Sequence, residues 1–177
     1  EPVKVYLGKG GNALGTLSLT PSSSSKQGTE NVSDDWRVSP AMMAQATSST
    51  NRLMYALPTL TDTVHLSGRP VVTLKLAANK SAVNLSVYLV TLPYDSTRIG
   101  SAGQVGVVTR GWADPQNHKS LKDDADYTSM DKGEPLKPGE YYTMTFPLQA
   151  DDQVYVAALS GTVTDVAAAA AHAPEES

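Results

Sequence analysis

The sequence predicts an all-β sandwich, and three observations support this. First, apolar and polar side chains alternate in short runs along most of the chain, which places one face of each run on a core and the other in water. Second, the 177 residues include 35 serines and threonines, 13 glycines and 11 prolines but only 18% charged residues, which is typical of a turn-rich β protein. Third, we find no amphipathic helix of three turns, so a parallel α/β sheet would lack its crossover helices.

The alternating runs predict the individual strands. They lie at residues 3–7, 16–20, 53–57, 72–76, 85–89, 105–109 and 141–148, and His65 falls within a further strand-like stretch. The residues that share the inward face of three of these runs form the predicted core: Leu74, Leu76, Leu85, Val87, Leu89, Met144, Phe146 and Leu148.

The segments between the runs are expected to be turns and loops. The GKGG sequence at residues 8–11 predicts a turn, because no Lys-Ser/Thr pair and no helix follow it as in a phosphate-binding loop. Residues 21–26 form a low-complexity loop, and the polar segment at 27–50 is expected to be anchored by Trp36, Met42 and Met43. One domain is expected over residues 1–162, with a disordered tail over 163–177, because its run of five alanines is too short for a stable isolated helix.

Charge and composition argue against several partners. The net charge of −4 and the pI of about 5.3, without a basic cluster, predict no nucleic-acid partner. No stretch approaches 18 apolar residues, so no membrane partner is predicted. The lack of cysteine excludes disulfides and thiolate sites and leaves the compartment open. The chain begins at Glu1 without a signal-type segment, so we expect it to be part of something longer.

A catalytic triad is not predicted. The serine nucleophile of such a triad usually occupies a G-x-S-x-G turn, and Ser67 and Ser160 each lack the first glycine. His65 is interpreted as a half-exposed strand residue and His172 as part of the tail, which leaves His118 in a polar loop. No catalytic residue is therefore assigned to this chain.

Metal-ligand residue types cluster in the second half of the chain. They are Asp114, Asn117, His118, Asp123, Asp124, Asp126 and Asp131. An EF-hand loop needs alternating oxygen ligands, a central glycine and a terminal glutamate, and this spacing does not supply them. An acidic surface loop is favoured over a weak Ca²⁺ site, so no metal and no cofactor is assigned.

The segment RGWADPQNH at residues 110–118 combines an arginine, a tryptophan, a proline-fixed turn and several hydrogen-bonding side chains. Loops of this composition carry function or contact a partner. A purely structural alternative is that Trp112 plugs one end of the sandwich. We interpret Arg110, Trp112, Asp114 and His118 as candidate domain-interface residues.

Several blocks of sequence occur in an order that resembles a known family. RLMYA at residues 52–56, PTL at 58–60, LSGRPVVTL at 66–74 and LSVYLV at 85–90 resemble the C-terminal domain shared by Xaa-Pro dipeptidyl-peptidases and the cocaine-esterase/acylase hydrolases. RGWADPQNH at 110–118, LKPGEYY at 136–142 and FPLQADD at 146–152 resemble the Xaa-Pro dipeptidyl-peptidase branch. The resemblance covers roughly residues 1–154.

The resemblance implies a jelly-roll β-sandwich of the galactose-binding-like type, attached after an α/β-hydrolase domain that carries the catalytic Ser, Asp and His. The chain would then be a non-catalytic docking and scaffolding domain of a serine hydrolase that releases X-Pro dipeptides from peptide N-termini. Its partner would be the hydrolase domain of the same protein, and peptide substrate would bind only through that domain. After residue 154 the sequence departs from the family pattern, which could leave a strand edge unpaired.

Two alternative functions remain open from the sequence. One is a free-standing carbohydrate-binding module, which would need exposed aromatic platforms. The other is an accessory domain of an esterase or acylase of the same superfamily. Because one fold supports many functions, the sandwich itself does not separate them.

Overall fold

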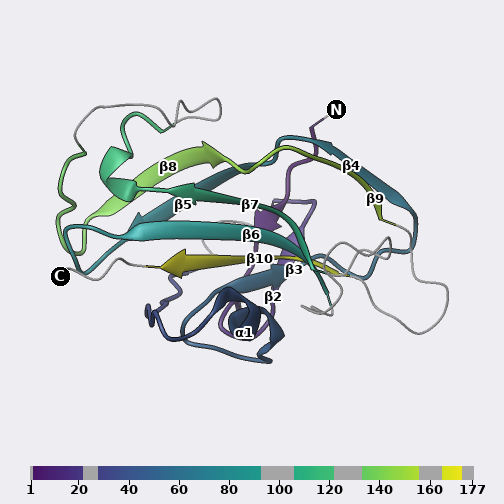
Figure 1. Cartoon of the computed structure of the whole chain (residues 1–177), viewed down its shortest axis with the longest axis horizontal. Coiled ribbons are helices and arrows are strands. Elements are labelled where there is room, and N and C mark those ends of the chain that lie inside the picture. The colour runs from purple at the N-terminus through teal and green to yellow at the C-terminus, as the bar shows by residue number, and fades with distance from the viewer. Residues whose placement is uncertain (1, 22–27, 93–105, 122–132, 156–164, 173–177) are drawn as a thin grey trace.

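A computed structural model describes residues 2–21, 28–92, 106–121, 133–155 and 165–172 (Figure 1). Nearly all of its regular structure is β-strand, which confirms the predicted fold class. The largest sheet has the strand order β1-β2-β3-β10-β6-β7. These strands span Tyr6–Leu7, Gly15–Ser18, Met54–Ala56, Asp165–His172, Asn84–Leu92 and Val107–Ala113. Among the described strands, the β2–β3 pair is parallel and the other pairs are antiparallel.

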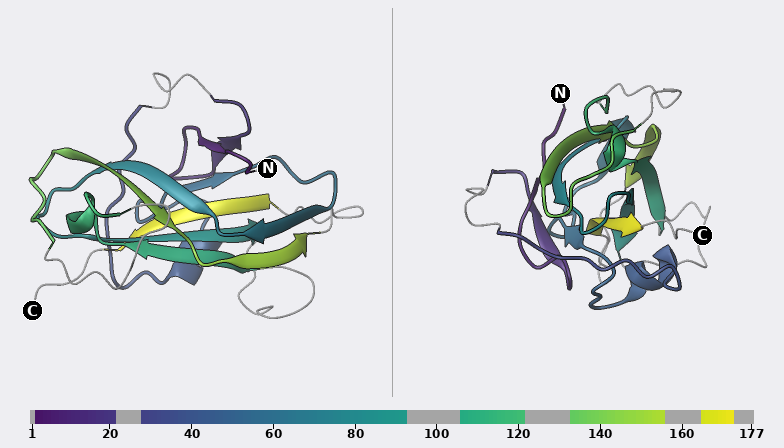
Figure 2. Two further views of the ribbon diagram at one scale, coloured as in Figure 1. Left: turned by 90° about the horizontal axis from the view of Figure 1, so that it is seen from above. Right: turned by 90° about the vertical axis from the view of Figure 1, so that its left-hand side faces the viewer.

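Residues 64–77 and 141–155 pair with each other in two successive ladders. Strand β5 (Val71–Ala77) pairs with β8 (Tyr141–Pro147), and β4 (Val64–Gly68) pairs with β9 (Asp151–Tyr155), both antiparallel. Between the two ladders, the Leu148 amide donates to the Pro70 carbonyl over 2.8 Å, so the pairing continues through the bend. Figure 1 shows the result as one long ribbon, and Figure 2 shows it curving past the larger sheet.

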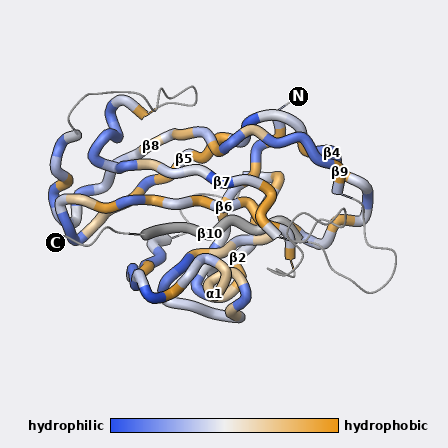
Figure 3. The backbone as a smooth tube through the Cα atoms, in the orientation of Figure 1, coloured by the Kyte–Doolittle hydropathy of each residue, from blue (hydrophilic) through white to orange (hydrophobic). Residues whose placement is uncertain are grey.

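The main core lies between the β5–β8 pair and strands β6 and β7. Phe146 is fully buried, and Met144 is 1% exposed. The cluster comprises buried Leu85, Val87, Ala113, Met144, Phe146 and Leu148, with Val72, Leu74, Leu76, Leu89, Leu121 and Tyr142 packed against it. All eight residues of the predicted core belong to it. Figure 3 shows apolar residues alternating with polar ones along these strands, as a two-sided β layer requires.

The opposite face of the six-stranded sheet carries a smaller apolar cluster. Met54 and Val90 are buried there, and Ala44 of the short helix α1 (Pro40–Gln45) packs against them. Tyr88 and Leu92 of β6 complete this cluster. Helix α1 therefore covers part of the face that points away from the main core.

The expectation of a disordered tail from residue 163 differs from the structure. Residues Asp165–His172 form β10, which pairs antiparallel with β3 on one side and β6 on the other. Alanine favours an isolated helix, but two flanking strands supply backbone partners on both sides, and this tertiary pairing overrides the local propensity. Strand β10 thus lies between β3 and β6 in the sheet.

The segment at 27–50 is anchored differently from the prediction. Trp36 is 63% exposed and Met42 is 58% exposed, so neither anchors the segment. The buried anchor is Arg52, which is 1% exposed. Its guanidinium donates to the carbonyl oxygens of Met43, Gly11, Ala13 and Ala46 over 2.6–2.9 Å.

Two other local expectations can be compared with the structure. The GKGG sequence does form a turn, closed by the Ala13 amide donating to the Gly10 carbonyl over 3.0 Å. The strand expected over residues 3–7 is limited to Tyr6–Leu7, and Val3 and Val5 are exposed. The four aspartates at residues 123, 124, 126 and 131 lie outside the described residues.

Candidate functional site

Strand β7 places Arg110 and Trp112 on the face of the sheet that points away from the main core. Gly111 between them faces the core, where a Cβ atom would lie 2.8 Å from Leu148 Cδ2 and 2.9 Å from the Pro147 carbonyl oxygen. Only glycine fits this close approach, so the adjacent side chains must point outward. Gly111 therefore allows the chain at Pro147 and Leu148 to pack closely against β7.

Arg110 and Trp112 form an exposed pair. The Arg110 guanidinium lies over the Trp112 ring, 5.1 Å from its centroid, and 46% of Trp112 is exposed. A cation–π contact of this kind at an exposed site contributes about 0.5–1 kcal/mol. Across the ladder, Tyr88 lies opposite Arg110 and Ser86 opposite Trp112. Trp112 is half exposed on a sheet face, which disfavours the alternative in which it plugs one end of the sandwich.

Asp114 is engaged within its own loop. It caps the short 3₁₀ helix η3 (Pro115–Asn117), where its carboxylate accepts the Gln116 amide over 2.9 Å. The Asn117 side-chain amide also donates to it, over 3.4 Å. This is the usual role of an aspartate at a helix start. Asp114 thus fixes the end of β7 rather than presenting a free carboxylate.

His118 is likewise engaged within the domain. Its Nδ1 lies 3.1 Å from the Pro115 carbonyl oxygen, and its ring lies 4.5 Å from the Tyr142 ring, centroid to centroid. Of the four candidate interface residues, two are therefore exposed and two hold the loop. Within the described part of the chain, no group of three or more His, Asp or Glu side chains could hold a metal ion.

The other described histidine side chain, His65, is exposed on β4. Its Nε2 pairs with the Asp152 carboxylate of β9, and both side chains are more than half exposed. Ser67 lies opposite Asp152 in the ladder, but among the described residues no hydrogen bond joins Ser67 to His65. No nucleophile–base pair is assembled here.

Among the described residues, no helix is long and apolar enough to cross a membrane.

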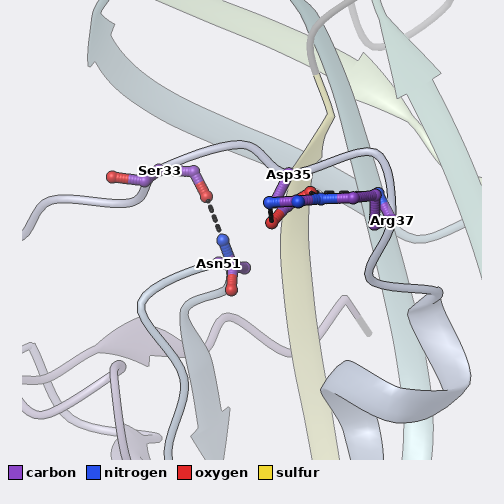
Figure 4. Close-up of polar contacts among 4 residues, drawn as sticks. All are labelled: Ser33, Asp35, Arg37 and Asn51. Carbon is purple, nitrogen blue, oxygen red and sulfur yellow. Dashed lines mark hydrogen bonds and ion pairs between the residues drawn. The ribbon is translucent and has the colours of Figure 1, made fainter.

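Sequence reasoning missed the ion-paired turn at residues 33–38. Arg37 makes a two-pronged ion pair with Asp35, with Nε–Oδ1 and Nη2–Oδ2 distances of 2.8 and 2.7 Å. The Arg37 guanidinium holds the pKa of Asp35 at about 2, well below its usual range. Figure 4 shows this pair beside the Asn51 side chain, which donates to the Ser33 carbonyl over 2.8 Å. A D-x-R spacing was the available signal, but such pairs are common on surfaces.

The fold defines an all-β domain, and no nucleophile–base pair is assembled among the described residues. The family model for the X-Pro dipeptidyl-peptidase C-terminal non-catalytic domain matches residues 1–157, and the chain belongs to this family.

Individual relatives agree with the family. The chain is 40% identical over 154 residues to a Rhodopirellula baltica protein named "Putative Xaa-Pro dipeptidyl-peptidase", covering 87% of the chain and 23% of that protein. A Streptomyces avermitilis protein of the same name is 30% identical, covering 80% of the chain and 24% of that protein. The chain thus spans about a quarter of the length of the curated relatives it matches.

Solved structures share the fold at low sequence identity. An α-amino acid ester hydrolase aligns with a TM-score of 0.66 and 16% identity, covering 97% of this chain and 29% of that one. An aminopeptidase from a marine sediment archaeon aligns with a TM-score of 0.53 and 14% identity, covering 80% and 20%. In both, the fold is part of a much longer chain.

Proposed function

We propose that this chain is the docking and scaffolding domain of a serine hydrolase that releases X-Pro dipeptides from peptide N-termini. Its partner is the α/β-hydrolase domain of the same polypeptide. The family match over residues 1–157 carries this proposal, because that family is the non-catalytic C-terminal part of such proteins. The share of 23% of a relative's length is what one accessory domain of a larger enzyme would occupy.

The docking surface is centred on Arg110 and Trp112. Arginine and tryptophan are enriched among residues that dominate binding energy, because each combines a large contact area with directional polar contacts. Gly111 and the capped helix η3 hold the two side chains outward, which lowers the entropy lost when a partner binds. Asp114 and His118 support the surface by fixing the loop that follows it.

A carbohydrate-binding role for Trp112 is disfavoured by the same geometry. A sugar stacks on the face of an exposed aromatic ring, and the Arg110 guanidinium already lies over the Trp112 ring at 5.1 Å. An esterase or acylase parent has the same fold, as the α-amino acid ester hydrolase illustrates. The relatives with detectable sequence identity are named for dipeptidyl-peptidase activity, which favours that branch.

The first test replaces Trp112 in the 177-residue chain and in the longer polypeptide that contains the hydrolase domain. Trp112→Ala is expected to lower the melting temperature and X-Pro turnover of the longer polypeptide, while the shorter chain loses little. Val107→Ala is the matched control, since Val107 lies on the same strand and is 44% exposed. Equal losses in both polypeptides would show that Trp112 stabilises only its own domain.

A second test addresses catalysis and ligands directly. The 177-residue chain is expected to release no product from X-Pro chromogenic substrates, because a positioned nucleophile and base each contribute orders of magnitude in rate. Turnover abolished by a serine-directed inhibitor would contradict this. The same chain is also titrated with a galactoside and with Ca²⁺ at micromolar concentration. Saturable binding that is lost in Trp112→Ala would contradict the docking role of Trp112 and support a ligand-binding role.

A further inference from the structure

Three exposed apolar residues lie at the open end of the β1–β2 hairpin. Val3, Val5 and Leu19 are 76%, 46% and 63% exposed. Val5 directly precedes Tyr6 and Leu19 directly follows Ser18, and Tyr6 and Ser18 are partners across the ladder. We name Val3, Val5 and Leu19 the entry patch, because they lie where the chain enters the domain. Single exposed apolar residues are ordinary on a surface, whereas a group of them marks a contact.

The sequence pattern of the entering segment also requires a covered face. Val3, Val5 and Leu7 alternate with Lys4 and Tyr6, which is the pattern of a strand that packs one face on a core. Of residues 2–7, however, only Tyr6 and Leu7 form a strand, and only these two are partly buried. The apolar alternation therefore extends toward the N-terminus beyond the part that this domain covers by itself.

The entry patch is also the place at which the rest of a longer polypeptide would arrive. The family is a C-terminal domain, and the chain spans 23–24% of two relatives, so most of such a polypeptide precedes it. Consecutive Cα atoms are about 3.8 Å apart, so the residue before Glu1 would lie within about 11 Å of the Val3 Cα atom. The N-terminal end lies at the outside of the molecule in Figure 1 and in the right-hand view of Figure 2.

We infer that the entry patch packs against an apolar surface of the polypeptide that precedes this chain. The covalent connection already holds the two surfaces close together, so little further freedom is lost when Val3, Val5 and Leu19 are covered. The alternation from Val3 to Leu7 is then buried along its whole length. This contact is distinct from the docking surface at Arg110 and Trp112, and the identity of its partner as a hydrolase domain rests on the proposed function.

Two leucines at opposite ends of the hairpin give a matched test. Leu19 follows β2 at the open end, whereas Leu14 precedes β2 at the turn end and is 50% exposed. Leu19→Ala is expected to lower the melting temperature of the longer polypeptide by several degrees and to leave that of the 177-residue chain nearly unchanged. Leu14→Ala is expected to change neither. Because Leu19 is well separated from the junction in sequence, a loss there reports a surface contact rather than the covalent connection.

A change of polarity at the entering segment gives a second, independent test. Val5→Thr keeps the shape of the side chain but adds a hydroxyl, which is unfavourable only where the side chain is covered. Val71→Thr is the matched control, since Val71 is 47% exposed on β5. We expect Val5→Thr to lower the melting temperature of the longer polypeptide and Val71→Thr to leave it nearly unchanged. Equal behaviour of these two variants, or of the two leucine variants, in the longer polypeptide would contradict the inference.

The outcomes separate this inference from the proposed function. A loss for Trp112→Ala without a loss for Leu19→Ala and Val5→Thr overturns the inference and leaves the docking surface at Arg110 and Trp112 intact, and the opposite result does the reverse. Sedimentation of the longer polypeptide tests the other occupant. A dimer that Leu19→Ala dissociates would overturn the inference in favour of a second copy of the protein.

Discussion

The Tyr55 hydroxyl donates to the Glu30 carboxylate over 2.7 Å, and the other oxygen of Glu30 accepts the backbone amides of Gly10 and Gly11. One carboxylate thereby joins strand β3, the GKGG turn and the segment that precedes helix α1. Two adjacent amides that point at one oxygen form a small anion-binding concavity. The glycine-rich turn is thus occupied by an anion of the protein itself, which agrees with its interpretation as a structural turn.

Phe146→Ala should strongly destabilise the domain. Phe146 is fully buried in the main core, and truncation of such a residue costs about 3–5 kcal/mol of unfolding free energy. Urea denaturation followed by circular dichroism measures the loss. Val71→Ala is the control, since Val71 lies on the paired strand β5 and is 47% exposed. A loss below about 1 kcal/mol for Phe146→Ala would mean that the inward face is misassigned.

Arg52→Ala should also be severe, although no carboxylate among the described residues pairs with Arg52. Burial lowers the pKa of Arg52 below its ordinary value, yet a guanidinium stays protonated, so its hydrogen bonds persist. Removing it leaves four carbonyls without this donor, and one unsatisfied buried group costs about 1–3 kcal/mol.

We therefore expect Arg52→Ala to lose at least about 3 kcal/mol in denaturant melts and Arg52→Lys to lose an intermediate amount. Arg37→Gln is the matched control, because its side chain is 73% exposed and an exposed ion pair contributes little to stability. Equal losses for the two arginines would show that the carbonyls at Arg52 find other donors.

Alkaline pH should destabilise the domain in a window set by Tyr155. Burial and the nearby Asp151 carboxylate raise the pKa of Tyr155 from 10.0 to about 12. Because the folded-state pKa lies above the unfolded value, the neutral Tyr155 hydroxyl contributes fully to stability below pH 10. That contribution is lost as the pH rises from 10 to 12. Burial and Glu30 raise the pKa of Tyr55 as well. Tyr155→Phe should therefore flatten the decline of the melting temperature in that window, and the double variant with Tyr55→Phe should flatten it further.

Asp35 should titrate unusually low for an exposed turn. Its hydrogen bonds and ion pair with Arg37 lower its pKa to about 2, so the stabilising contact persists at ordinary pH and is lost as pH falls through that value. Carboxyl NMR shifts measured against pH give the value directly. Arg37→Gln should raise the pKa of Asp35 toward the ordinary range, while the backbone amide of residue 37 still donates to its carboxylate. An unchanged low pKa in that variant would require another cation or donor at Asp35.

Local sequence predicted the main core more fully than it predicted the outward placement of Trp112. Alternation placed Phe146, Met144 and Leu148 on one face correctly, because side chains in a strand alternate whatever their partners are. The motif at residues 110–118 was singled out for its composition, and its four candidate residues divide by exposure. Asp114 and His118 are partly buried and are engaged by a helix cap and by an aromatic neighbour, Tyr142, respectively.

Periodicity and motif order were enough to establish the fold class, the main core and the family, since each depends on residues close together in the sequence or on blocks in a fixed order. Only the folded chain decided the burial of Arg52, the pairing of Glu30 with Tyr55 and the conversion of the alanine run into β10. Arg52 and Gly11 are 41 residues apart, and Tyr55 and Glu30 are 25 apart. A buried donor or an unpaired strand is satisfied by whichever backbone the fold brings beside it, and that choice is made by tertiary packing rather than by neighbours in the sequence.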